Sequence, residues 1–243
     1  MKTVAAIAIV GTASLVASAD AGFLGFVASV RTVGANTVID VFAGVSNASD
    51  KFLNVYNANI STTLAGGFVQ KAGLATKTWK PDTAGFTSTR NTLDDSFMTA
   101  GTFSGGQYGG EYYASSNTNG DPNFTGSSWN ATPASPAATT IPNLAGWYTG
   151  DPTSVDNVSE SLLGLVNRQD LSGGAAATRG IWCAHFVVAT AGGNINFSAF
   201  TSIKDGVTGG TSQAQSSGTF FVPAPGALAL VSLAGFASRR RRA

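Results

Sequence analysis

Short apolar segments separated by clusters of glycine, serine and asparagine run through the chain from Gly22 to Val222. Segments of this length, bounded by residues that favour turns, are typical of antiparallel β-strands. The pattern predicts strands at Phe23–Val30, Thr37–Val45, Phe52–Ile60, Leu74–Lys80, Ser96–Thr102, Glu111–Ala114, Gly180–Thr190, Ile195–Ile203 and Thr219–Val222. We therefore expect an all-β protein whose main body is an antiparallel, jelly-roll-like β-sandwich.

Local sequence also predicts the turns and the exceptions to the strand pattern. Glycine supplies the positive φ angles that tight turns need, so Gly192-Gly193 between two predicted strands predicts a hairpin. Only Val158–Asn167 has apolar residues at a helical spacing. The segment Ser115–Thr153 mixes several prolines with asparagine and serine, so we expect a long loop there rather than core strands.

The N-terminal residues have the organisation of a secretory signal peptide. Lys2 precedes an apolar stretch from Val4 to Val16, and small residues follow this stretch. Ala19 and Ala21 occupy positions at which the cleaving protease accepts only small side chains. We therefore expect a helical signal peptide over residues 1–21, cleaved after one of these alanines, and an exported protein.

The C-terminal residues combine three features in order. A Pro-x-Pro segment comes first, formed by Pro223, Ala224 and Pro225. A charge-free stretch of 12 residues, Gly226–Ala237, follows. As a helix this stretch spans about 18 Å, which is short for a bilayer core of about 30 Å. The chain then carries four arginines, Arg239, Arg240, Arg241 and Arg242. We expect a short transmembrane helix whose arginines stay on the cytoplasmic side.

This tail resembles the C-terminal sorting signal of PEP-CTERM proteins, which are substrates of the membrane enzyme exosortase. The resemblance covers Val222–Arg242 and includes the two prolines, the apolar helix and the basic end. Ala224 departs from the family pattern, which has glutamate at this position. The resemblance implies an exosortase-type enzyme as partner, a transient stay in the cytoplasmic membrane, and transfer to the cell surface or extracellular matrix. It also implies an association with exopolysaccharide.

These features divide the chain into a signal peptide (1–21), a secreted β domain (22–221) and a sorting signal (222–243). The whole chain of 243 residues has a net charge of +1, with 14 basic and 13 acidic residues. Removing Lys2 and the four terminal arginines leaves the processed protein mildly acidic. A mildly acidic protein without a basic stripe is not typical of nucleic-acid binding, so we expect no nucleic-acid partner. The single cysteine excludes an internal disulfide.

Few residues of the predicted β domain are suited to catalysis. Cys183 and His185 lie two positions apart on one strand, about 7 Å from each other, which is too far for proton transfer and favours a buried structural pair. Acidic residues can form a glycosidase pair or bind Ca²⁺, but beside glycine and proline they are more typical of turns. The acidic groups are Asp94, Asp95, Asp151, Asp156 and Glu160, and the Ca²⁺ candidates are Asp121, Asn123, Asp151 and Asp156. We expect no catalytic residue, metal or cofactor, with Ca²⁺ as the open alternative.

Aromatic residues gather in the loop-rich half of the chain, at Tyr108, Tyr112, Tyr113, Trp129, Trp147 and Tyr148. Exposed rings beside asparagine and aspartate are typical of carbohydrate-binding sites, although tryptophan and tyrosine also pack in cores. Trp129, Trp147 and Tyr148 are therefore candidates for glycan binding. The alternative to a noncatalytic surface protein is a secreted carbohydrate-binding module or glycan-active enzyme associated with exopolysaccharide.

The acceptor triplet Asn-x-Ser/Thr recurs along the chain, at Asn47, Asn59, Asn123, Asn130, Asn157 and Asn196. Such triplets are the acceptor sites of N-glycosylation in exported proteins, where they occupy surface loops. They are more frequent here than chance predicts, so glycosylation of some of them is a hypothesis.

Overall fold

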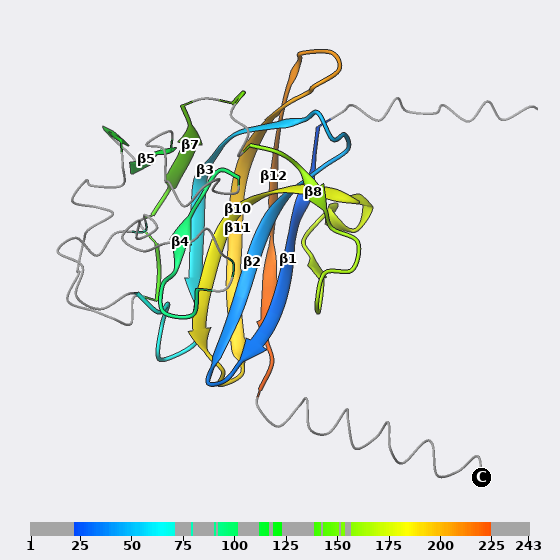
Figure 1. The fold of residues 1–243 in the computed structure, drawn as a ribbon. Coiled ribbons are helices and arrows are strands. Elements are labelled where there is room, and N and C mark those ends of the chain that lie inside the picture. The colour runs from blue at the N-terminus through cyan, green and yellow to red at the C-terminus, as the bar shows by residue number, and fades with distance from the viewer. Residues whose placement is uncertain are drawn as a thin grey trace, which may run out of the picture.

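A computed structural model describes residues 22–70, 79, 90, 92–101, 112–116, 119–122, 139–141, 143–150, 152–153 and 157–224 (Figure 1). The expected signal peptide, the apolar helix over Gly226–Ala237 and most of the strand expected at Leu74–Lys80 lie outside these residues. Within the described residues, no helix has the length and apolar character needed to cross a bilayer.

The described residues form an all-β fold of two antiparallel sheets, which confirms the expected class. The first sheet has the order β4-β10-β2-β1-β9, and β8 pairs with β10. Its strands are β1 (Phe23–Val33), β2 (Asn36–Val45), β4 (Phe97–Met98), β8 (Glu160–Ser161), β9 (Gln169–Asp170) and β10 (Arg179–Ala189). Among the described residues the only helical element is a 3-10 turn, η1 (Gly174–Ala176).

The second sheet has the order β12-β11-β3-β7-β5-β6, again with antiparallel neighbours. Its strands are β3 (Lys51–Thr62), β5 (Tyr112–Ser116), β6 (Asn119–Pro122), β7 (Ala145–Thr149), β11 (Gly193–Lys204) and β12 (Thr211–Val222). β11 and β12 pair residue by residue along their whole length, without a bulge. The β11–β12 end of this sheet is therefore a regular surface on which side chains alternate between the two faces.

The inner faces of the two sheets share one hydrophobic core. Phe26 on β1 meets Phe197 on β11 edge to face, with ring centroids 4.7 Å apart. Trp147 on β7 reaches across to β10, where its indole nitrogen donates to the carbonyl of Cys183 at 3.0 Å. In Figure 1 the strands of the two sheets lie one layer behind the other. β3 and β11 alternate between buried and more exposed positions, whereas β2 and β10 are buried along nearly their whole length. The apolar side chains of both sheets thus meet in a common core.

The turn at Gly192-Gly193 connects the two sheets, so the hairpin predicted there is wrong. β10 pairs with β2, β4 and β8 in the first sheet, whereas β11 pairs with β3 and β12 in the second. Gly192 does have the positive φ expected of a turn, at 71°. Glycine therefore indicated the turn, but the choice between a hairpin and a crossover depends on which strands lie beside β10 and β11.

The helix predicted at Val158–Asn167 is also wrong, because this segment contains β8 followed by two turns. Gly164 and Asn167 both have positive φ angles, 82° and 41°, which interrupt a right-handed helix. The backbone is held by neighbouring strands instead, as in the hydrogen bond of 3.0 Å from Val30 N–H to the Val166 carbonyl. The helical spacing of apolar residues did not lead to burial, since Val166 is more than half exposed.

The loop expected over Ser115–Thr153 contains strands, which corrects that prediction in part. β6 and β7 fall within it, and Pro122 ends β6 at the sheet edge, where proline is tolerated. β12 is longer than the predicted Thr219–Val222. The prediction missed its first eight residues, because six of them are polar and most are exposed along a sheet edge. Conversely, within the described part of the predicted strand Ser96–Thr102, which ends at residue 101, only Phe97–Met98 forms a strand.

Candidate functional site

The outer face of the second sheet carries a patch of amide and hydroxyl side chains. On β11 the inward neighbours Ile195, Phe197 and Ala199 are buried in the core, which turns Asn196 and Ser198 outward. β3 repeats this pattern, with buried Ile60 between outward-facing Asn59 and Ser61. The alternation of the strands therefore separates a fully apolar inner face from a polar outer face.

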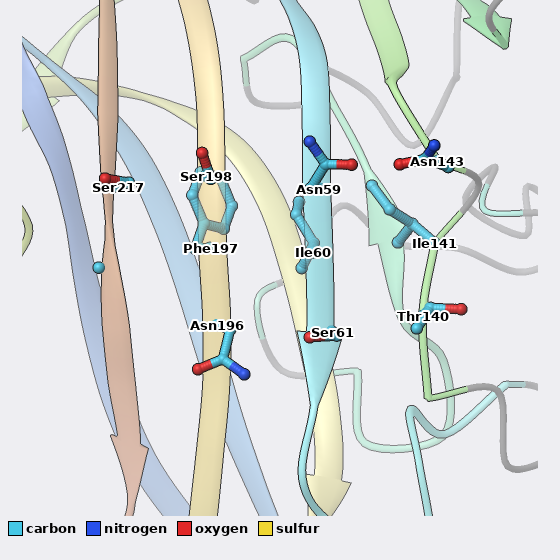
Figure 2. A pocket seen from close by; sticks show the side chains of 11 residues that line it. Asn59, Ile60, Ser61, Thr140, Ile141, Asn143, Asn196, Phe197, Ser198 and Ser217 are labelled. Carbon is cyan, nitrogen blue, oxygen red and sulfur yellow. The ribbon is translucent and has the colours of Figure 1, made fainter.

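The antiparallel register places these polar residues in two rows. Asn59 lies opposite Ser198, which lies opposite Ser217 on β12. In the second row Ser61 lies opposite Asn196, which lies opposite Thr219. Figure 2 shows the first row crossing the strands from Ser217 through Ser198 to Asn59. Two Asn-x-Ser triplets on neighbouring strands thus form an alternating lattice of amides and hydroxyls.

A groove of about 640 Å³ lies over this lattice. One side is formed by the segment before β7, which is attached to β3 by a hydrogen bond of 3.1 Å from Ile141 N–H to the Ile60 carbonyl. We call this the polar groove, and its polar lining is Asn59, Ser61, Thr140, Asn143, Asn196, Ser198 and Ser217. In Figure 2, Thr140 and Asn143 extend the two rows beyond β3.

Many polar groups of the groove remain available for a ligand. Asn196 uses its amide oxygen to accept a bond from the Thr219 hydroxyl at 3.3 Å, but its amide nitrogen has no partner within the described part of the chain. The Ser198 hydroxyl accepts a bond from Gln215 at 3.2 Å. Within the same described residues, the hydroxyls of Ser61 and Ser217 make no hydrogen bond.

An aromatic pair lies beside the groove on the same face. Tyr56 on β3 and Phe200 on β11 are cross-strand partners, and their rings stack with centroids 5.3 Å apart and an interplanar angle of 23°. The Tyr56 hydroxyl donates to the Gln213 side chain on β12 at 3.3 Å. Both rings are partly exposed. The sequence analysis did not single out this pair, because only the bulge in β3 and the strand register bring the two rings together.

The electrostatic character of the groove is neutral, because none of its lining residues is charged. Amides offer both donors and acceptors, and hydroxyls offer either. Such a surface can bind an uncharged ligand with many hydroxyl groups, but it contains no general base beside a nucleophile. Among the described residues no group of three or more His, Cys, Asp or Glu side chains could hold a metal ion.

The reactive-looking residues of β10 lie in the interior, away from the groove. His185 is fully buried, and its Nδ1 lies 2.7 Å from Asp40 while its Nε2 lies 3.0 Å from the Thr92 carbonyl oxygen. The Cys183 thiol contacts the Val41 carbonyl at 3.3 Å, and burial raises its pKa far above the usual range. His185 therefore pairs with Asp40 rather than with Cys183.

The two predicted glycan-binding residues that the structure describes, Trp147 and Tyr148, point to opposite faces of β7. Trp147 is only 1% exposed, and its indole donates to the carbonyls of Thr99 and Cys183 at 3.0 Å each, so the prediction of an exposed ring there is wrong. A tryptophan inside the predicted loop Ser115–Thr153 gives no signal of such burial; the pairing of β7 with β3 produces it. Tyr148 is 36% exposed on the opposite face of β7, and Trp129 lies outside the described residues.

The remaining sequence candidates fall mainly outside the described residues. Pro223 is partly buried and Ala224 is exposed just after β12. Ala19, Ala21, Pro225, Arg239, Arg240, Arg241 and Arg242 lie outside, as do the Ca²⁺ candidates Asn123, Asp151 and Asp156. Asp121 belongs to β6. Of the acceptor asparagines, Asn59 and Asn196 are exposed, whereas Asn157 is buried with its amide paired to the Phe52 backbone.

Comparison of the chain with family models, with curated proteins and with solved structures gave no match.

Proposed function

We propose that this chain is an exported cell-surface or extracellular-matrix protein that an exosortase-type enzyme sorts through its C-terminal tail. The proposal is supported by the position at which β12, the last strand of the second sheet, ends. β12 stops at Val222, and Pro223 and exposed Ala224 follow at once. The motif read by the enzyme thus begins at the first residue after the sheet.

The chemistry of proline supports this arrangement. Proline has no backbone N–H and fixes its φ angle, so Pro223 and Pro225 cannot continue the β11–β12 ladder. Such a segment is expected to stay outside regular secondary structure, which is the form that a processing enzyme can bind. Because the ladder is complete before the motif, cleavage there removes no strand of the second sheet.

The proposed sequence of events uses both ends of the chain. A signal peptide over residues 1–21 directs export and is cleaved after Ala19 or Ala21. The apolar helix over Gly226–Ala237 then holds the protein in the cytoplasmic membrane, and Arg239–Arg242 prevent complete translocation. The released body is a noncatalytic, jelly-roll-like β-sandwich without a cofactor.

The test is fractionation of the producing cells with a variant that lacks Ser238–Ala243. We expect the truncated chain to escape normal processing, because it has lost the charges that stop translocation. A matched control replaces the four arginines with lysines, which keeps the positive charge, and this variant is expected to be processed. Mass spectrometry of the mature C-terminus gives the second readout. Extracellular protein with an intact Arg242 contradicts the proposal.

The second candidate function is carbohydrate binding, and the polar groove is the observation that favours it. An uncharged concave surface lined by amides and hydroxyls, with aromatic rings beside it, has the chemistry that holds sugars. This function is compatible with the first one, because the groove lies on the face of the second sheet and the sorting motif follows the end of β12.

A further inference from the structure

We propose that the polar groove binds an uncharged polysaccharide that lies across β12, β11 and β3. This inference rests on the second candidate function, since it assigns the ligand class and the residues that bind it. It places the glycan site on the lattice of Asn59, Ser61, Asn196 and Ser198, whereas the sequence candidate Trp147 is buried in the core.

The lining of the groove is uncharged, and this favours an uncharged ligand. An anionic polymer held here would lose water around its charges and find no lysine or arginine in the lining to replace it. A hydrocarbon ligand would leave the amides and hydroxyls without hydrogen bonds. A chain of neutral sugars satisfies both conditions, because its hydroxyl groups donate and accept hydrogen bonds without carrying charge.

The arrangement of the polar rows favours a ligand that runs across the strands rather than along them. Neighbouring strands in a sheet lie about 4.8 Å apart, so each row offers a new polar group at this interval. The first row runs over Ser217, Ser198 and Asn59 and continues to Asn143 (Figure 2). A polymer with regularly repeated hydroxyls meets a regular series of partners only when it crosses the strands.

The unpaired groups in the groove supply the binding energy. Asn196 and Ser61 are cross-strand partners. Within the described residues, the amide nitrogen of Asn196 and the hydroxyl of Ser61 have no hydrogen-bond partner. An asparagine amide carries a donor and an acceptor side by side, which suits two adjacent sugar hydroxyls. At Asn59 a sugar competes with two long hydrogen bonds, one donated to the Asn57 carbonyl at 3.4 Å and one accepted from Leu144 N–H at 3.5 Å. The partly exposed rings of Tyr56 and Phe200 add apolar contact for the face of a sugar next to the groove.

The experiment measures binding of the full chain, kept in a sugar-free detergent, to a panel of polysaccharides. Dextran, glucomannan and xyloglucan are the neutral probes, and alginate and heparin are the anionic ones. The variants are Asn59→Ala and Asn196→Ala. The matched control is Asn194→Ala, which makes the same change on the same strand and face, two residues away from Asn196 and outside the groove lining.

We expect saturable binding to at least one neutral probe and none to the anionic probes. Each groove variant should weaken this binding about tenfold, while Asn194→Ala leaves it unchanged. Thermal unfolding checks that the variants are folded, as expected for exposed side chains. Absence of binding to every neutral probe overturns both the inference and the second candidate function. Sugar binding that is lost in Trp129→Ala but retained in both groove variants overturns the inference alone.

Discussion

At the residue scale, His185 shows how a side chain that is reactive in principle becomes structural through its surroundings. Asp40 lies opposite it on β2, and Arg31 approaches the second carboxylate oxygen of Asp40 at 3.3 Å. Phe97 stacks on the imidazole with centroids 4.8 Å apart. Both ring nitrogens lie within hydrogen-bonding distance of an oxygen atom, so His185 is held between Asp40 on β2 and the Thr92 backbone.

The Asp40 carboxylate is therefore expected to be important for stability. Asp40→Asn leaves His185 and Arg31 without their anionic partner in a buried site, and we expect it to lower the free energy of unfolding by about 3 kcal/mol or more. Asp170→Asn is the control, because Asp170 pairs with Arg168 at 2.7 Å in a partly exposed position, where the loss is expected to be about 1 kcal/mol or less. Urea unfolding at neutral pH measures both, and equal losses would contradict the argument.

Cys183 gives a pH-dependent prediction. Burial raises the pKa of its thiol in the folded protein, whereas in the unfolded chain the thiol ionises near pH 8.5, roughly the ordinary value. Above that pH the unfolded state binds fewer protons, so the free energy of unfolding falls as pH rises. We expect wild type to lose about 1.4 kcal/mol per pH unit more than Cys183→Ala above about pH 9. Identical slopes in denaturant titrations of the two proteins would refute the prediction.

At the element scale, two turns from different strand pairs lock together at one end of the molecule. Asp50, at the end of the turn between β2 and β3, is fully buried. One of its oxygens accepts a bond from Asn47 N–H at 2.9 Å and the other from Gly206 N–H at 3.1 Å. Gly206 belongs to the turn between β11 and β12. The carboxylate thus joins a connection between the sheets to a hairpin of the second sheet.

The contact between the two turns requires glycine at position 206, because a larger residue would not fit. A Cβ there would lie 2.2 Å from the Ser49 carbonyl oxygen, which belongs to the backbone and cannot rotate away. Gly206→Ala should therefore lower the free energy of unfolding by about 2 kcal/mol or more. Gly209→Ala in the same turn is the control: its φ is 75°, but no atom lies within 4 Å of the added Cβ, so about 1 kcal/mol is expected. Thermal or urea unfolding compares them, and a milder effect at Gly206 would contradict the steric argument.

The elements also show how far local sequence can be interpreted. β1, β2, β3, β10 and β11 were predicted almost over their full lengths, because alternating or continuous apolar residues reflect their burial. The first part of β12 was missed, since an edge strand needs only one neighbour and its polar residues give no hydrophobic signal. β7 was missed because five residues between proline-rich segments are too few to show a period.

At the scale of the whole molecule, the polar groove depends on contacts between distant parts of the chain. Asn59 and Ser198 are cross-strand partners although they are 139 positions apart, and the segment near Asn143 closes one side. Asn59 and Asn196 were noted as acceptor triplets, but nothing in either triplet indicates that the two lie on adjacent strands. Trp147 failed as a glycan-binding candidate for the opposite reason, because the pairing of β7 carries it into the core.

The sequence by itself determined the all-β class and the position of most long strands, because alternation of apolar residues is a local consequence of burying one face of a strand. It also supplied the expected export and sorting signals, since short linear segments carry them. Only the tertiary structure decided that Gly192-Gly193 crosses between sheets, that His185 pairs with Asp40, and that two Asn-x-Ser triplets line one groove. Those outcomes depend on which strands become neighbours, and strand pairing is settled by packing of the whole core.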